Sequence, residues 1–351
     1  MVAAPLLLLL AAAIATCSEE GAGLITAADA CPRLDAQAAV DAESASDAGT
    51  ALSDAGDGSS DAGDPPADAA SPPDAACLGC SAYARASSRG RTPEVLAETS
   101  GLAMSAAHPG VLFAHNDSGD TAHLFAIDLE GNLLGEFVLP GVTAVDWEDM
   151  AIGPCPAGSC AFIGDIGDNL QTRTNYAVYR VPLPSVEVGK PVGRMSVTFD
   201  RLPFKYPSAA KWNAETLLVH PLTGDLYVLN KVSQGSPSTA FKFPQPLTPG
   251  VTATLSQVAT LPVPKSTDSF LTGGDIHPCG NAMLLRTYNR LYEFHLDPAL
   301  PFDSIFTTSD FDAVPVAVEQ QGETVAYQPA GRGYVTVGEG SRVPINAYSC
   351  Q

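Results

Sequence analysis

The sequence is poor in basic residues. Its 18 lysines and arginines stand against 39 aspartates and glutamates, which gives a net charge of −21 at pH 7. Such an excess of negative charge repels a phosphate backbone, so the composition argues against a nucleic-acid partner. Two catalytic motifs are also missing: a P-loop that would cradle phosphates, and a Gly-x-Ser-x-Gly elbow that would present a nucleophilic serine. We therefore expect neither a P-loop phosphate site nor a nucleophilic serine on such an elbow.

Large apolar residues are scarce in residues 18–76. This stretch has thirteen acidic residues and one basic residue, Arg33, and Asp-Ala-Gly recurs at 47–49, 54–56 and 61–63. Most of its other residues are Ala, Ser, Gly and Pro, which bury too little surface to offset chain entropy. We predict a disordered, self-repelling spacer, and the acidity of the chain is mainly a property of that spacer.

The first sixteen residues contain an apolar run that is too short to cross a membrane as a helix, and Cys17 follows directly. This arrangement is typical of an export signal. The phrase Ile14-Ala15-Thr16-Cys17 resembles the bacterial lipobox, which implies cleavage before Cys17 and acylation of that residue. We expect an exported lipoprotein of the outer membrane or cell surface. Ordinary secretion and a misplaced start are the alternatives.

Eight cysteines suit an oxidising compartment. Cys155 and Cys160 flank a Pro-Ala-Gly-Ser turn between two apolar runs, so we predict a disulfide across a hairpin. Cys279 and Cys350 are also predicted to pair, because both should lie on one face of neighbouring repeats.

A Cys-x-x-Cys, formed by Cys77 and Cys80, lies in a short lead-in at 77–90. No second Cys or His pair accompanies it, so a structural disulfide or a free pair is favoured over a zinc or redox site. The partners of Cys31, Cys77 and Cys80 stay open.

Helical periodicity is absent beyond residue 91. The apolar runs there are short and bounded by Gly, Pro, Asn and Asp, which is typical of an all-β domain. One motif recurs five times: a small or acidic residue, an apolar strand, a turn, and a second apolar strand that ends in polar residues. The copies begin at Ser100, Glu148, Glu215, Thr272 and Glu323, and in the last four a proline follows six residues later (Pro154, Pro221, Pro278 and Pro329).

Two further strands fit between successive copies. We expect them at 122–127 with 133–139, 176–181 with 195–200, 239–243 with 252–261, and 290–296 with 302–307. Four antiparallel strands per repeat predict a β-propeller of five blades over residues 91–351. Residues 92–97 would supply the outermost strand of the last blade, beside 342–350. Six blades are the alternative if an insertion hides a copy. A β-sandwich is disfavoured, because that fold would not require five equivalent units.

The repeat gathers polar side chains at one mouth of the propeller channel. The first strand of a blade runs along the axis and the second returns antiparallel, so the start of one and the end of the other share a face. The leading residues of the motif should ring this mouth: Ser100, Glu148, Glu215, Thr272 and Glu323. One shell further out we expect Asn116, Asp117, Asp165, Lys231, Arg286, Tyr288 and Glu339.

Three converging carboxylates repel one another, and a ring of oxygen ligands suits Ca²⁺. We therefore predict a Ca²⁺ held by the ring at the starts of the inner strands. The alternative is that these glutamates accept hydrogen bonds from neighbouring blades and bind nothing.

The order Ser, Glu, Glu, Thr, Glu resembles the five-bladed propeller of the calcium-activated nucleotidases, or apyrases. The resemblance implies a central Ca²⁺ beside a pocket that hydrolyses nucleoside di- and triphosphates, with Asp275 as a substitute ligand for Thr272. The longer blade signatures of that family and a set of basic residues for phosphates are absent. The phrases at 116–120, 146–149, 164–169 and 321–327 resemble uncharacterised secreted bacterial propellers, including phytase-like and esterase-like ones.

Two functions of different classes follow. The first is a lipid-tethered binding or scaffold module with a structural Ca²⁺, whose partner is a small anionic ligand, a glycan or a protein. The alternative is a Ca²⁺-dependent hydrolase of a phosphorylated or other anionic small molecule. Lys231 and Arg286 would then hold the anion, and Asp117 or Asp165 would accept a proton. The loop at 165–169 is interpreted as an Asx-turn, with a cation loop as the alternative.

Overall fold

The computed structural model describes residues 79–351 apart from 118, 120, 233–235 and 263–269. The expected signal segment at 1–17 with Cys17, the spacer at 18–76, and Cys31 and Cys77 lie outside the described residues. In the described part, no helix combines the length and the apolar character that crossing a membrane requires.

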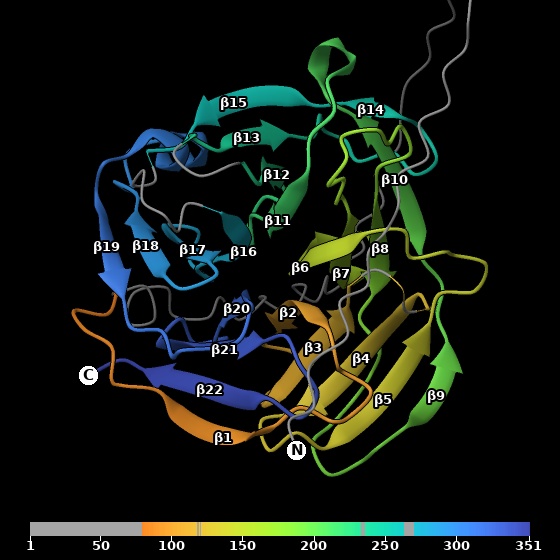
Figure 1. Cartoon of the computed structure of the whole chain (residues 1–351), viewed down its shortest axis with the longest axis vertical. Coiled ribbons are helices and arrows are strands. Elements are labelled where there is room, and N and C mark those ends of the chain that lie inside the picture. Colours follow the sequence, from red (N-terminus) through yellow and green to blue (C-terminus); the bar gives the residue numbers. More distant parts are fainter. Residues whose placement is uncertain (1–78, 118, 120, 233–235, 263–269) are drawn as a thin grey trace, which may run out of the picture. The chain divides into compact units, whose positions relative to one another are not determined.

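The described chain forms five sheets that surround a common axis (Figure 1). The first blade has β2 (Thr99–Met104), β3 (Val111–Asn116), β4 (His123–Asp128) and β5 (Leu133–Val138), and the second has β6 (Trp147–Cys155), β7 (Gly158–Asp165), β8 (Ala177–Pro182) and β10 (Asp200–Lys205). The third has β11 (Ala214–Val219), β12 (Leu226–Asn230), β13 (Thr239–Lys242) and β15 (Ser256–Thr260). The fourth has β16 (Leu271–Ile276), β17 (Ala282–Thr287), β18 (Leu291–His295) and β19 (Phe311–Val314), and the fifth has β20 (Gly322–Tyr327), β21 (Gly333–Gly338), β22 (Pro344–Ser349) and β1 (Ser87–Arg91). This confirms the predicted five-bladed all-β propeller.

The inner strands β2, β6, β11, β16 and β20 each contact the next around the axis, and β20 contacts β2, so the ring is closed. The hydrophobic cores lie between adjacent blades. One core, for example, joins Phe113 of the first blade to Ile163 of the second. Because both faces of a blade are buried in this way, its inner strands appear in the sequence as nearly continuous apolar runs.

Every inner strand carries a β-bulge near its start. The pairing register with the second strand shifts between Thr99 and Gly101 in β2, and at the matching place in the other four blades. The leading residue of the sequence motif lies within each shift. A bulge leaves a residue outside the regular ladder and re-aims its side chain. The five predicted ring residues therefore share one backbone feature.

Two of the strands predicted between the copies differ from the observed ones. Residues 302–307 form a 3₁₀ helix, η2 (Phe302–Thr307), which buries Ile305 and Phe306 instead of pairing with β18, and β19 takes that edge. The fourth strand of the second blade was expected at 195–200, but the observed strand, β10, begins only at Asp200. The residues before it form β9 (Gly193–Ser196), which pairs in parallel with β5 of the first blade.

Strand exchange of this kind occurs twice. The short strand β14 (Ala253–Thr254) of the third blade pairs in parallel with β10 of the second. In both cases a connection within one blade covers the outer edge of the preceding blade. Open sheet edges invite unwanted pairing, so this arrangement protects them and joins neighbouring blades.

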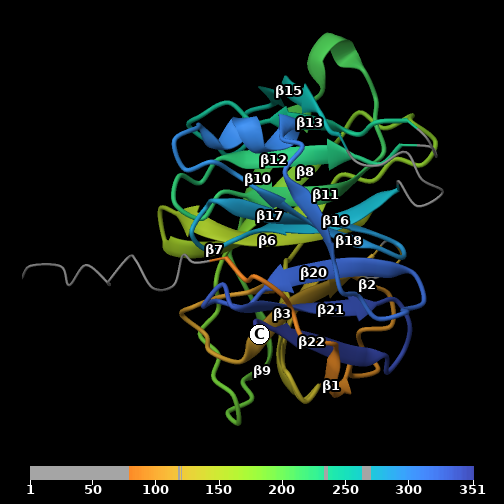
Figure 2. The ribbon, with the colours of Figure 1, turned by 90° about the vertical axis from the view of Figure 1, so that its left-hand side faces the viewer.

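The ring closes through the N-terminal segment, as expected, but with other residues. Strand β1 pairs with β22, and the side view shows β20, β21, β22 and β1 in that order (Figure 2). Residues 92–97 were predicted to have this place. Pro93 lacks an N–H for a ladder, and Leu96 is fully buried with its N–H bonded to the carbonyl of Pro93, so this segment turns inward.

Cys155 pairs with Cys160, as predicted from the hairpin. The predicted Cys279–Cys350 pair is wrong, because Cys350 is bonded to Cys80. The lead-in runs beside the chain end, where Tyr83 bridges to Cys350, and this brings Cys80 within reach. Cys279 is also disulfide-bonded, to a cysteine other than Cys350.

Candidate functional site: an acidic mouth of the channel

The first two ring residues touch each other. Ser100, the second residue of β2, donates a hydrogen bond from Oγ to Oε2 of Glu148, the second residue of β6, at 3.4 Å. Both side chains are buried. The structure therefore brings these two of the predicted ring residues into contact.

Two further carboxylates join Glu148. Asp117 directly follows β3, and Asp146 directly precedes β6. Carboxylate oxygens of Asp117, Asp146 and Glu148 all lie within 4.8 Å of one another, and we call these residues the acidic triad. Ligands on opposite sides of a Ca²⁺ ion are separated by roughly 4.6–5.2 Å, twice the Ca–O distance, so the span fits.

Gly167 gives the acidic triad its space. A Cβ atom at this position would overlap both Oε1 of Glu148 and Oδ2 of Asp146. The backbone N–H of Gly167 also donates to the carbonyl of Asp146, at 3.2 Å. The loop after β7 therefore packs against the two carboxylates in a way that a larger residue would prevent.

The other three ring residues have partners of their own. Glu215 accepts from Nζ of Lys231 at 2.5 Å and from Nδ2 of Asn213 at 3.2 Å. Thr272 donates from Oγ1 to the carbonyl of Gly322 at 2.8 Å.

Glu323 shares a hydrogen bond with Glu339. The ring is thus uneven: the densest group of carboxylates lies toward the first and second blades.

Burial and mutual repulsion make these carboxylates weak acids. Burial raises the pKa of Glu148 well above its usual range, and the charges of Glu215, Asp117 and Asp146 raise it further. Burial, followed by the charge of Asp117, raises the pKa of Asp146 to about 6. Burial and then the charge of Glu339 raise the pKa of Glu323 to about 9. A bound cation would relieve both effects.

The four residues expected to hold an anion and to move protons each have a different partner in the protein. Asp117 belongs to the acidic triad. Asp165 is buried and paired with Arg173 at 2.5 Å, and Lys231 is paired with Glu215.

Arg286 is fully buried between blades. Its Nη2 lies 2.5 Å from Oε2 of Glu319, and its Nη1 donates to the carbonyl of Thr324 at 2.8 Å. Its contacts are those of a structural cation that joins the fourth and fifth blades.

The loop at 165–169 is organised as a turn. Asp168 accepts from the backbone N–H groups of Thr172 and Arg173 at 2.8 and 2.9 Å, and from the hydroxyl of Tyr176 at 2.5 Å. Both carboxylate oxygens therefore have donors within the protein. This favours the Asx-turn interpretation over a cation loop.

Asp149 is a central residue that the sequence reasoning missed. Its carboxylate accepts backbone N–H bonds from Met150 of β6, Leu217 of β11 and Gly274 of β16, at 2.8, 3.0 and 3.1 Å. The side chain is fully buried, and burial raises its pKa. The phrase Asp-Trp-Glu-Asp contains both Asp146 and Asp149. Strand alternation predicts that residues 148 and 149 face opposite sides, so it does not predict that both lie near the axis. The β-bulge between Trp147 and Met150 interrupts that alternation.

The motif prolines converge at the opposite mouth. Pro154, Pro221, Pro278 and Pro329 all line one cavity of about 410 Å³. Asp275 also lines it, where it accepts N–H bonds from Ile276 and Tyr327 at 2.8 and 2.7 Å. Asp275 thus lies away from the acidic mouth and does not replace Thr272 there.

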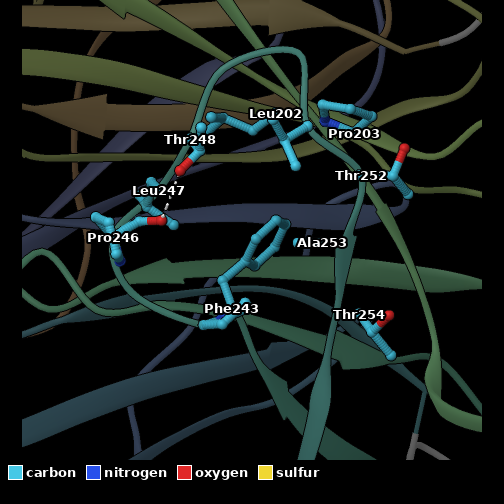
Figure 3. Close-up of a pocket in the computed structure, with 11 residues that line it drawn as sticks. Leu202, Pro203, Phe243, Pro246, Leu247, Thr248, Thr252, Ala253 and Thr254 are labelled. Atoms are coloured by element: carbon cyan, nitrogen blue, oxygen red, sulfur yellow. Dashed lines mark hydrogen bonds between the residues drawn. The ribbon is translucent and has the colours of Figure 1, made fainter. Parts of the chain in front are cut away.

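A smaller cavity of about 260 Å³ lies beneath the connection that leads to β14 (Figure 3). Leu202, Phe243 and Leu247 line it, and the ring of Phe243 points into the space between Leu202 and Ala253. None of its described lining residues is charged. Its described lining therefore offers no carboxylate for a metal ion and no cationic side chain for an anion.

No protein-family model matches the chain, and no curated protein matches it. Solved structures that resemble it include an auxiliary nutrient binding protein from Bacteroides thetaiotaomicron (11% identity, 74% of this chain and 72% of that chain, TM-score 0.41). A gluconolactonase from Xanthomonas campestris has 14% identity over 73% of each chain and a TM-score of 0.40. The hydrazine synthase of Kuenenia stuttgartiensis has 14% identity over 70% of this chain and 94% of that chain, with a TM-score of 0.37. The function must therefore be inferred from the residues of the site.

Proposed function

We propose that this chain is an exported, lipid-tethered binding module whose propeller binds Ca²⁺ at the acidic mouth. The observation that carries the proposal is the acidic triad: three carboxylates whose oxygens lie within 4.8 Å of one another, with Glu148 buried. Carboxylates this close are unfavourable unless they are protonated or share a cation.

The donor set fits a hard cation. Asp117, Asp146 and Glu148 offer carboxylate oxygens, and the hydroxyl of Ser100 contacts Glu148. Sulfur and imidazole donors, which would favour zinc or copper, are not part of this group of described residues. Ca²⁺ takes six to eight oxygen ligands in a flexible geometry, so water and backbone oxygens would complete the set.

Binding suits this mouth better than hydrolysis of an anion. A hydrolase of phosphorylated molecules needs cations that are free to hold phosphate, and Lys231 and Arg286 are instead paired with Glu215 and Glu319. Asp165 is likewise paired, with Arg173. Ca²⁺ at the acidic triad would stabilise the junction of the first two blades and set the charge of the surface that a partner meets.

Calcium titration by calorimetry tests the proposal. The chelator-treated chain should bind Ca²⁺, and Glu148→Gln should weaken the affinity at least about tenfold, which corresponds to roughly 1.4 kcal/mol. Glu187→Gln, at an exposed glutamate paired with Lys190, serves as the control and should leave the affinity unchanged. If titration of the unaltered chain with millimolar Ca²⁺ gives no heat of binding, the carboxylates of the acidic mouth have only a structural role.

Export and the lipid tether rest on residues 1–17 of the sequence, and they are tested separately. In a bacterial host that processes lipoproteins, the chain should enter the membrane fraction, and mass spectrometry should find an acylated Cys17 at the mature N-terminus. Cys17→Ala should move the chain to a soluble exported fraction. Recovery of an unprocessed chain in the cytoplasm would contradict this part of the proposal.

A further inference from the structure

The cavity at the opposite mouth of the channel takes no part in the proposed calcium site. It has a volume of about 410 Å³, which lies within the range of small-ligand sites in proteins. The residues that line it all belong to the described part of the chain, and they come from all five blades. We call it the proline cavity.

Small apolar residues form much of its wall. Pro154, Pro221, Pro278 and Pro329 line it from four blades, and Ala106 has the same place in the first blade, six residues after the leading residue of the motif. Proline has no backbone N–H, so these four positions present C–H surface and no donor that could hold an anion.

Larger apolar side chains add to this wall. Those that line the cavity from the same place in four inner strands are Met104, Ile152, Ile276 and Tyr327. Met104 and Ile152 are partly exposed, and a methionine side chain adapts its shape to a neighbour. The hydroxyl of Tyr327 donates to Oε1 of Glu293 at 2.7 Å, so the tyrosine ring is held in place.

Asp275 is the one charged residue among those that line the proline cavity. Its side chain is half-buried, and each carboxylate oxygen accepts one backbone N–H, from Ile276 at 2.8 Å and from Tyr327 at 2.7 Å. A carboxylate oxygen can accept two hydrogen bonds. Both oxygens of Asp275 therefore keep an acceptor site, in an orientation that the backbone fixes.

No cationic side chain compensates Asp275 within the described residues, because its partners there are the two N–H groups. Burial raises the pKa of Asp275 to about 7, and these N–H groups oppose the rise. Burial also raises the pKa of Asp149, and the charge of Asp275 adds to that effect. A negative charge in an apolar cavity, with a second carboxylate near it, attracts a cationic ligand and repels an anionic one.

We infer that the proline cavity binds a small organic cation, whose ammonium group donates to the carboxylate of Asp275 and whose apolar body packs against the prolines and Met104. Apolar walls with one fixed polar group are typical of small-ligand sites. The inference goes beyond the proposed function, because this cavity shares no residue with the acidic triad.

Saturation-transfer NMR on the full chain tests the inference with two amines, 2-phenylethylammonium and cyclohexylmethylammonium. At about pH 8 Asp275 is mostly ionised and alkylamines remain protonated. At least one of the amines should bind with a dissociation constant on the order of 1 mM or tighter. The neutral analogues 2-phenylethanol and cyclohexylmethanol, and the anion 3-phenylpropionate, should bind at least about tenfold more weakly.

Variants of the cavity separate charge from shape. Asp275→Asn removes the charge and should weaken the amine at least about tenfold, while the neutral analogue stays within about threefold. Ala106→Lys adds a positive charge to the exposed part of the wall and should also weaken the amine about tenfold, whereas the uncharged Ala106→Gln should stay within about threefold. Ala299→Lys, at an exposed residue outside the cavity, is the control and should leave the affinity unchanged.

The two Ala106 variants decide the outcome if Asp275→Asn does not fold, since Ala106 is exposed. Glu148→Gln should lose Ca²⁺ affinity and retain the amine, so a failure of the calcium site is distinguishable from a failure of this one. The inference is overturned if neither amine binds at about 50 mM, if the neutral analogues bind as tightly as the amines, or if Ala106→Lys binds the amine as well as Ala106→Gln does.

Discussion

At the scale of single residues, Gly167 sets how closely two carboxylates of the acidic triad approach. Its missing side chain leaves room for Glu148 and Asp146. Gly167→Ala should push these carboxylates apart and weaken the affinity for Ca²⁺ at least about tenfold in a calorimetric titration. Gly79→Ala is the matched control, because a Cβ at residue 79 would meet no atom of the described residues beyond its chain neighbours within 4 Å. Equal affinities for the two variants would mean that Ca²⁺ binds elsewhere.

Asp149 joins three blades through one carboxylate. Asp149→Ala would leave the backbone N–H groups of Met150, Leu217 and Gly274 without their acceptor in the interior. Each such loss costs about 1–3 kcal/mol, so we expect the free energy of unfolding to fall by roughly 3–5 kcal/mol in a denaturant titration. Asp312→Ala, at a side chain that is 80% exposed, should change it by less than about 0.5 kcal/mol.

At the scale of secondary-structure elements, histidines hold the turn of one blade to the next. His277 follows β16, accepts from the N–H of Cys279 through Nδ1 at 3.2 Å, and donates from Nε2 to the carbonyl of Gly331 at 3.1 Å. His220 after β11 repeats the pattern toward Gly280. Gly280 and Gly331 have φ values of +70° and +67°, which suits glycine in turns that a histidine approaches closely.

These histidines give the fold a dependence on acid. Burial lowers the pKa of both His220 and His277, so the folded chain keeps them neutral while the unfolded chain protonates near pH 6.5. Their stabilisation is complete above pH 6.5 and is lost as the pH falls toward their folded pKa. The free energy of unfolding of His277→Gln should therefore fall less steeply than that of the unaltered chain between about pH 6.5 and 5. Parallel slopes would show that His277 does not contribute.

The two described disulfides should stabilise the fold by different amounts. Cys80–Cys350 spans 270 residues and closes the ring, whereas Cys155–Cys160 spans five residues of one hairpin. Chain entropy predicts a larger stabilisation for the longer loop, on the order of 5 kcal/mol against roughly 2 kcal/mol. Cys80→Ser should therefore lower the melting temperature more than Cys155→Ser does. The reverse order would mean that β1 remains paired with β22 without its cystine.

At the scale of the whole molecule, the acidic mouth should couple stability to pH and Ca²⁺. Burial raises the pKa values of Glu148 and Glu323, so their contribution to the stability of the calcium-free chain is greatest at low pH and is lost as the pH rises through the folded values. Ca²⁺ binds the ionised carboxylates, so its stabilisation grows over the same range. The rise in melting temperature on adding Ca²⁺ should be larger at pH 8.5 than at pH 5.5, and an equal rise at both values would contradict this coupling.

The sequence by itself determined the parts of this protein that depend on neighbouring residues. Five copies of one motif, each with a bounded pair of apolar strands, were sufficient to predict five blades, because burial on both faces of a blade produces such runs. The Cys155–Cys160 pair followed from one hairpin. The position of Glu148 at the start of β6 followed from the alignment of the copies.

Only the tertiary structure decided which distant segments meet. Cys80 with Cys350, and β1 with β22, depend on how the ring closes, and no local pattern specifies that register. Asp146 joins Glu148 because the bulge in β6 re-aims its side chains and because the loop with Gly167 packs against both. Local periodicity reports which residues are buried, whereas contacts between blades depend on the geometry of the closed ring.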